Sequence, residues 1–159
     1  RLARARGLTV ELGDARSTVV PPASLVIALG EVLAYLQGAE SALVPAFSAA
    51  HKILPPGGHC VFDLPDPSAT HEVVQQSGPG WHVLSETDCQ GPTLVRRITV
   101  ALGGTETQEV HRLRVYPPDR VAELATAWGF SAEPLRAFGP AEFPTGRTGY
   151  LCRRLAEAG

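Results

Sequence analysis

Methionine is missing from all 159 residues of this sequence, and long apolar runs are missing as well. No stretch approaches the roughly 18–20 consecutive apolar residues that a membrane-spanning helix needs, so we expect no membrane partner. The segment Arg1–Arg4 has no apolar core behind it and therefore lacks the pattern of a secretory signal. Because translation begins at methionine, we also expect that Arg1 is not the start of the gene product.

An excess of charge and a cysteine framework are also missing. The 14 lysine and arginine residues stand against 16 aspartate and glutamate residues, so the formal net charge of −2 gives no reason to expect nucleic acid as a partner. The three cysteines, Cys60, Cys89 and Cys152, form no CxxC pair and no zinc-binding spacing. We therefore expect reduced thiols in a cytoplasmic protein, and no metal site.

The common catalytic fingerprints are absent too. The sequence contains no GxSxG, no GxxxxGK[ST], no HExxH and no GxGxxG, which disfavours serine hydrolases, P-loop enzymes, zinc proteases and nicotinamide enzymes. Its composition, with 44% hydrophobic and 19% charged residues, is that of a globular chain. The length predicts one domain over residues 1–159 with a substantial hydrophobic core.

The first 67 residues alternate between strand and helix patterns. Leu8–Leu12, Leu25–Leu29 and His59–Leu64 are short apolar runs of the kind found in parallel strands buried on both faces. Between the last two, residues 41–54 form an amphipathic pattern that predicts a helix. This alternation predicts an α/β fold with parallel strands and right-handed crossovers.

The rhythm changes after residue 80. The segments Trp81–Glu86, Leu94–Leu102 and Glu109–Tyr116 predict three strands without helices between them, with a tight turn at Gly103-Gly104. Alternate residues from Arg96 to Leu102 share one face, so we expect a half-buried antiparallel insertion over about 81–116. A helix at 119–128 and strands near Glu133–Phe138 and Thr148–Arg153 are predicted to complete the chain.

This order of elements resembles the later part of a class I S-adenosylmethionine-dependent methyltransferase of the small-molecule type. The residues that carry the resemblance read TVELGDAR, ASLVIALGEVLAYL, LPPGGHCVFDLPDP, PPDRVAELATAWGF and RTGYLCRR. The resemblance implies a Rossmann-like sheet with the order 3-2-1-4-5-7-6, in which strand seven is antiparallel. The family's first strand, its glycine-rich loop and the acidic end of strand two have no counterpart, so we expect at least one βαβ unit before Arg1.

The resemblance implies a cofactor site for S-adenosylmethionine at the carboxyl ends of the strands, where open α/β sheets bind ligands. Gly13, Asp14 and Ala15 would meet the adenine, and Leu29, Gly30 and Glu31 would lie beside the methyl group. Two alternatives stay open: Asp14 is a turn or cap residue, and Glu31 is a first-turn helix glutamate favoured by the helix dipole.

Candidate catalytic residues are His111, Glu31 and Tyr35, with Tyr150 as a further tyrosine. A general base assists methyl transfer when the acceptor carries a proton, and histidine is the usual choice. The alternative for His111 is a surface or packing role. Asp63 and Asp66 end the strand His59–Leu64 on the same rim, and either meet the substrate or form a turn.

Three functional hypotheses follow. The first is methyl transfer to a small-molecule acceptor, in which the insertion either helps to shape the acceptor pocket or joins two copies into a homodimer. The second is a non-catalytic fragment or degenerate subunit that pairs with another protein through its sheet edge. The third is an unrelated α/β binding domain that ignores adenosyl ligands.

Overall fold

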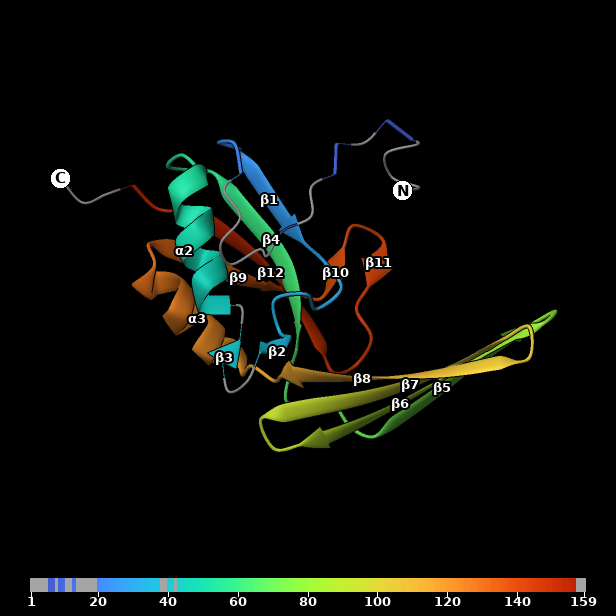
Figure 1. The fold of residues 1–159 in the computed structure, drawn as a ribbon. Helices are drawn as coiled ribbons and strands as arrows, with labels where there is room; N and C mark the ends of the chain where they lie inside the picture. The colour runs from blue at the N-terminus through green and yellow to red at the C-terminus, as the bar shows by residue number, and fades with distance from the viewer. Residues whose placement is uncertain are drawn as a thin grey trace.

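The computed structural model describes residues 6–7, 9–10, 13, 20–37, 40–41 and 43–156, with the backbone alone for 36–37 and 40–41. Most of the predicted strand Leu8–Leu12 lies outside the described residues, and Thr9 and Val10 carry no strand assignment. Figure 1 shows two parts, a helix-covered sheet and a long antiparallel sheet that projects from it.

The first sheet has four strands with one antiparallel member. β1 runs parallel to β4, and β12 runs antiparallel to β4 and to β9. The spatial order β1-β4-β12-β9 is the order 4-5-7-6 that the resemblance implied. The predicted fold class is therefore confirmed for this part of the sheet. The strands are β1 (Leu25–Ala28), β4 (His59–Pro65), β9 (Phe130–Leu135) and β12 (Arg147–Arg154).

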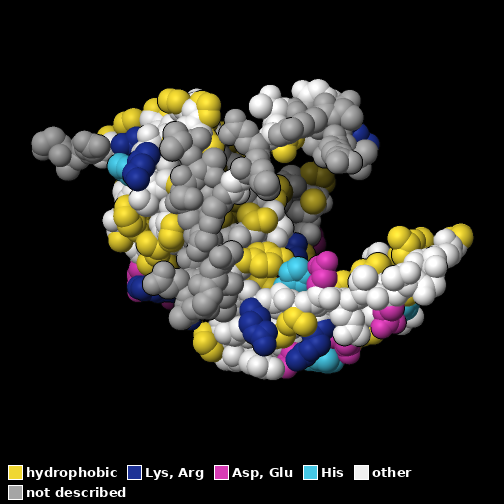
Figure 2. All heavy atoms as spheres, viewed as in Figure 1, with side chains coloured by type: hydrophobic (Ala, Val, Ile, Leu, Met, Phe, Trp, Pro, Cys, Tyr) yellow, Lys and Arg dark blue, Asp and Glu magenta, His cyan; other side chains and the backbone are white. Residues whose placement is uncertain are grey.

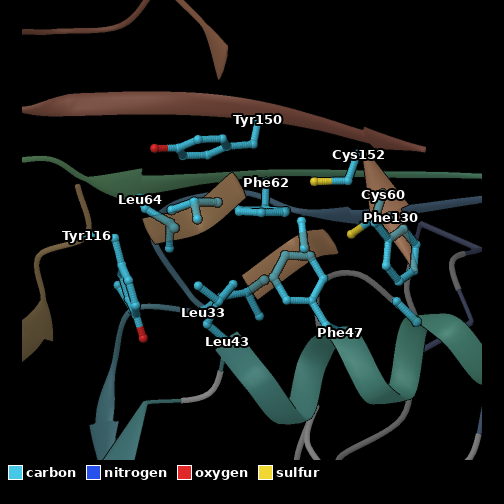
Figure 3. Packing of buried hydrophobic residues seen from close by; sticks show 14 of the residues in the cluster. Leu33, Leu43, Phe47, Cys60, Phe62, Leu64, Tyr116, Phe130, Tyr150 and Cys152 are labelled. Atoms are coloured by element: carbon cyan, nitrogen blue, oxygen red, sulfur yellow. The ribbon is translucent and has the colours of Figure 1, made fainter. Parts of the chain in front are cut away.

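The hydrophobic core lies between this sheet and two helices, α2 (Leu43–Ile53) and α3 (Pro118–Ala127). Phe62 of β4 packs edge-to-face on Phe47 of α2, with ring centroids 5.7 Å apart, and stacks on Tyr150 of β12 at 5.3 Å (Figure 3). All three side chains are at most 2% exposed. The alternating pattern of β4 thus directs Phe62 toward α2 and its neighbour Asp63 to the other face of the sheet.

The second sheet is the antiparallel insertion, with the strand order β5-β6-β7-β8. Gly103 and Gly104 form its last turn with φ angles of 57° and 82°, as the sequence predicts for a two-residue hairpin. In Figure 2 hydrophobic side chains lie along this projecting sheet as far as its tip. The strands are β5 (Glu72–Gly78), β6 (Trp81–Gln90), β7 (Thr93–Leu102) and β8 (Thr105–Arg114).

β5 has no local signal in the sequence that predicts a strand. Its sequence, EVVQQSG, has no apolar alternation, and six of its seven residues are exposed. The strand forms because the backbone of β6 offers hydrogen-bonding groups along Trp81–Thr87. Backbone pairing rather than side-chain burial therefore determines this element. Four short strands complete the described structure: β2 (Leu36–Gln37), β3 (Glu40–Ser41), β10 (Ala137–Phe138) and β11 (Ala141–Glu142).

β1 has an open edge within the part of the chain that the structure describes, because it pairs with β4 alone. Leu25 and Ile27 are 49% and 59% exposed on one face of this strand. Val26, Ile27 and Ala28 line an apolar cavity of about 190 Å³ together with residues of α2. A strand with apolar side chains on both faces is typical of the middle of a parallel sheet. No described helix is long and apolar enough to cross a membrane.

Candidate active site

A buried carboxylate holds the loop that follows β1. Asp63, which lies in β4 and is 1% exposed, accepts a hydrogen bond from the backbone N–H of Gly30 through Oδ1 at 2.7 Å. Its Oδ2 accepts a second bond from the N–H of Glu31 at 3.2 Å. Asp63 therefore connects the carboxyl ends of two parallel strands, which is the place where open α/β sheets bind ligands.

This loop has an unusual backbone. Gly30 has φ +85°, which glycine adopts without penalty, but Glu31 has φ +60°, which costs a residue with a Cβ about 1–3 kcal/mol. Val32 to Ala34 then form a turn in which Ala34 donates its N–H to the carbonyl of Glu31 at 2.9 Å. The alternative interpretation of Glu31 as a first-turn helix residue is wrong, because no helix begins there.

Two arginines hold the Glu31 side chain, which is only 3% exposed. Arg96 Nη1 of β7 and Arg147 Nη2 at the start of β12 lie 2.9 Å and 3.2 Å from the same oxygen, Oε2. Arg147 Nε also lies 3.6 Å from Asp63 Oδ2. We call Glu31, Asp63, Arg96 and Arg147 the Glu31 cluster. This cluster connects the loop after β1 with β4 and β12 of the first sheet and with β7 of the antiparallel sheet.

His111 and Tyr35 lie beside this cluster. Thr87, Arg96 and His111 stand directly opposite one another on β6, β7 and β8, so their side chains share one face of the antiparallel sheet. His111 Nε2 is 3.0 Å from Glu109 Oε2, and its ring meets the Tyr35 ring edge-to-face at 5.6 Å. The structure thus brings the three predicted catalytic residues into one neighbourhood, with Arg96 between Glu31 and His111.

A cavity of about 140 Å³ opens next to the Glu31 cluster. Residues 69–72, which lead into β5, and residues 144–147, which lead into β12, form its walls together with Thr87 of β6 and Leu94 and Arg96 of β7. His71 lines this cavity, whereas His111 does not. No cluster of metal-ligating side chains occurs within the described ranges. The charged and polar lining residues include Glu31, His71, Glu72, Thr87, Arg96 and Arg147.

Asp66 closes a turn beside the cavity. Its Oδ1 accepts hydrogen bonds from the N–H and the hydroxyl of Ser68, and its Oδ2 accepts one from the Thr148 hydroxyl at 2.6 Å. Burial alone would raise the pKa of the Asp66 carboxyl, but these hydrogen bonds outweigh it and lower that pKa below its ordinary value. The turn interpretation of Asp66 therefore accounts for its contacts.

The remaining predicted site residues differ in whether they are described and in how far they are buried. Asp14 and Ala15 lie outside the described residues, while Gly13 lies within them. Leu29, directly after β1, is 49% exposed. Tyr150 is 1% exposed in the core, where burial raises the pKa of its hydroxyl to about 12, and it is not among the residues that line the cavity.

Sequence reasoning missed Arg96 and Arg147 as site residues. The sequence around Arg96 shows only that this residue alternates with apolar residues, and no local pattern marks Arg147 as a site residue. Their common partner, Glu31, is far away in the chain, 65 residues from Arg96. Only the register of β7 against β6 and the pairing of β12 with β4 bring these side chains together.

Comparison with solved structures identifies the fold as that of S-adenosylmethionine-dependent methyltransferases. An S-adenosylmethionine-dependent methyltransferase from Clostridium acetobutylicum ATCC 824 matches 98% of this chain with a TM-score of 0.78 at 15% identity, over 69% of its own length. DesVI of Streptomyces venezuelae matches 95% at TM-score 0.73 and 22% identity, over 67% of its length.

The sugar N-methyltransferase KedS8 from Streptoalloteichus sp ATCC 53650 is similar over 98% of this chain, with a TM-score of 0.71 and 22% identity. The chain spans about two thirds of the length of these structures: 67% of KedS8 and 63% of the CcbJ methyltransferase from Streptomyces caelestis. No protein-family model matches the sequence, and no curated protein does.

The lowered pKa of Asp66 predicts a specific loss of stability in acid. A carboxyl whose pKa is lower in the folded state stabilises the fold above its unfolded pKa, and this contribution is lost as the pH falls below that value. The ordinary pKa is 3.8, so the wild-type chain should lose more unfolding free energy between pH 7 and about pH 3 than Asp66→Asn does. Urea unfolding at both pH values measures this, with the exposed Asp119→Asn as control. Equal losses in wild type and Asp66→Asn would contradict the assignment.

Proposed function

We propose that this chain serves S-adenosylmethionine-dependent methyl transfer to a small-molecule acceptor. The observation that carries the proposal is the Gly30-Glu31 loop, fixed by Asp63 at the carboxyl edge of a methyltransferase-like sheet. Two structures with this fold, described as a sugar N-methyltransferase and an amino pentose methyltransferase, support a small-molecule acceptor. Structures of the glycopeptide N-methyltransferase MtfA with S-adenosylmethionine and S-adenosylhomocysteine support the cofactor.

The residues after β1 fit a cofactor that approaches the backbone closely. A Cβ on Gly30 would meet no atom within 4 Å, so the space above this residue is open. The neighbouring Leu29 presents an exposed apolar side chain. We assign Leu29, Gly30 and Glu31 to the cofactor's methyl-bearing end. Gly13, Asp14 and Ala15 are assigned to the adenine on the resemblance in sequence.

When bound, S-adenosylmethionine supplies an electrophilic methyl carbon, so the protein's main task is to orient the acceptor and receive its proton. His111 is proposed as the base, because Glu109 at 3.0 Å orients its ring and Tyr35 packs against it. The carboxylate of Glu31 is already engaged by two arginines. We therefore propose that Glu31 positions the loop rather than taking the proton.

The cofactor assignment predicts that Gly30→Ala weakens the binding of S-adenosylhomocysteine about tenfold, because the substitution strains a positive φ and places a methyl group above the loop. Isothermal titration calorimetry measures the affinity. Gly91→Ala is the matched control, since Gly91 has φ +60° and an equally open Cβ position in the turn between β6 and β7. Equal weakening by both substitutions would contradict the assignment.

The proposed base predicts that His111→Asn lowers kcat by about a hundred- to ten-thousand-fold. The measurement is methyl transfer to a panel of small amines and amino sugars, made with a form of the protein that binds S-adenosylhomocysteine. His82→Asn is the control, because His82 lies on the opposite face of the sheet and contacts Ser77. An unchanged kcat in His111→Asn would remove this histidine from the mechanism.

A homodimer through the antiparallel sheet is a further part of the proposal. Trp81 and Leu102, which stand opposite each other near the tip, are 39% and 64% exposed. Val83, Ile98 and Val100 continue their face toward the body of the protein. An exposed apolar face of this kind is typical of an interaction surface, and a second copy offers the same face in return.

The dimer proposal predicts that Leu102→Glu halves the mass seen in sedimentation equilibrium, because it places a charge at the most exposed position of this apolar face, near the tip of the sheet. Val110→Glu is the matched control: Val110 is 56% exposed on the opposite face of the same sheet. A wild-type chain that sediments as a monomer would rule out this homodimer.

A second candidate is a non-catalytic subunit that pairs with another protein segment through β1. Among the described residues β1 pairs on one side only, and this edge and the 190 Å³ apolar cavity beside it favour this candidate. The calorimetric titration separates the two functions when it is repeated with a form extended upstream in the gene. Binding of S-adenosylhomocysteine by either form favours the enzyme, and binding by neither favours the pairing subunit. A cytoplasmic location is proposed from the three free cysteines.

A further inference from the structure

Arg147 has more hydrogen-bond donors than partners. Its guanidinium lies 3.2 Å from Glu31 and 3.6 Å from Asp63, but within the described residues its side chain makes no hydrogen bond, and Nε is buried without an acceptor. A guanidinium carries five N–H donors in a planar fork. The fork of Arg147 therefore stands at the cavity wall with most of its donors unused.

Arg96, which lines the same cavity, is in a similar situation. It donates through Nη1 to Glu31 at 2.9 Å and through Nε to the Thr87 hydroxyl at 3.4 Å. These two bonds leave donors on both terminal nitrogens without a partner among the described residues. Both guanidinium groups contact the same oxygen of Glu31, so this single carboxylate cannot satisfy the two forks.

Within the Glu31 cluster, the carboxylates of Glu31 and Asp63 balance the two guanidinium charges. They do not supply an acceptor oxygen for every N–H donor. Both oxygens of Asp63 already accept backbone N–H bonds from Gly30 and Glu31. Glu72 lines the cavity but is exposed, so water screens its charge. Several donors of the two guanidinium groups at this cavity therefore lack a protein acceptor among the described residues, and ionised oxygens make the strongest bonds to guanidinium groups.

We propose that this cavity binds an anionic oxygen group, a carboxylate or a phosphate, between Arg96 and Arg147. The cavity of about 140 Å³ is close in size to the roughly 150 Å³ cavity that holds benzene, so it has room for such a group with a short stem. Glu31, which follows the proposed cofactor residue Gly30 in the chain, lines the same cavity. The anionic group thus belongs to the methyl acceptor, and this last step alone rests on the proposed function.

The test is a titration of the full 159-residue chain with inorganic phosphate and, separately, with acetate at constant ionic strength. The Nε–H signals of the arginines are followed by NMR. We expect a saturable shift of the Arg96 and Arg147 signals. Arg147→Gln should weaken the binding about tenfold or more, because it removes charge-assisted hydrogen bonds. Arg120→Gln is the control, since Arg120 is exposed on α3 and pairs with Glu123.

Arg147→Lys is a second variant that keeps the charge and removes the fork, and it should bind more weakly than wild type. It also replaces Arg147→Gln as the test if thermal unfolding shows that Arg147→Gln does not fold. Tighter binding of phosphate than of acetate identifies a phosphate-bearing ligand, and the reverse order identifies a carboxylate. No saturable shift, or equal weakening by Arg120→Gln, would overturn the proposal.

A parallel titration with S-adenosylhomocysteine separates this inference from the proposed function. Binding of S-adenosylhomocysteine without binding of phosphate or acetate overturns the anion site and leaves methyl transfer standing. Anion binding that depends on Arg147, without any binding of S-adenosylhomocysteine, supports the site and contradicts its link to a methyl acceptor.

Discussion

The structure of the site depends on the two hydrogen bonds that Asp63 accepts from the backbone of Gly30 and Glu31. A buried carboxylate without partners would be costly, and backbone N–H groups left unpaired beside it would add to that cost. The Asp63 carboxylate and the two backbone N–H groups therefore depend on each other to be buried without this cost. Because the two groups come from neighbouring parallel strands, the bonds fix where the chain leaves β1, and so where the candidate cofactor loop lies.

The positive φ of Glu31 follows from this arrangement. A left-handed conformation at a glutamate is maintained only when surrounding contacts compensate for it. Here the compensation comes from Asp63 on the backbone side and from Arg96 and Arg147 on the side chain. The same contacts attach the antiparallel sheet to the body, so the geometry of the loop and the placement of the sheet are determined together.

The sequence predicts the parts of this fold that have a local signal. Apolar runs indicate β1 and β4, helical periodicity indicates α2, and Gly103-Gly104 indicates the last hairpin. β5 lacks such a signal, because its backbone pairing with β6 determines it. Likewise Glu31 is recognised by its position after a strand, whereas its arginine partners depend on long-range register that no local pattern encodes.

Within the described residues, the Glu31 loop is held by side-chain contacts on one side only. On the side of β4, Asp63 and the arginines restrain the loop; on the other side, β1 has no neighbouring strand in the described part of the sheet. Arg96 and Arg147 make their described contacts with Glu31, Asp63 and Thr87 rather than with that edge, so the proposed anion site and the proposed cofactor loop can be tested separately.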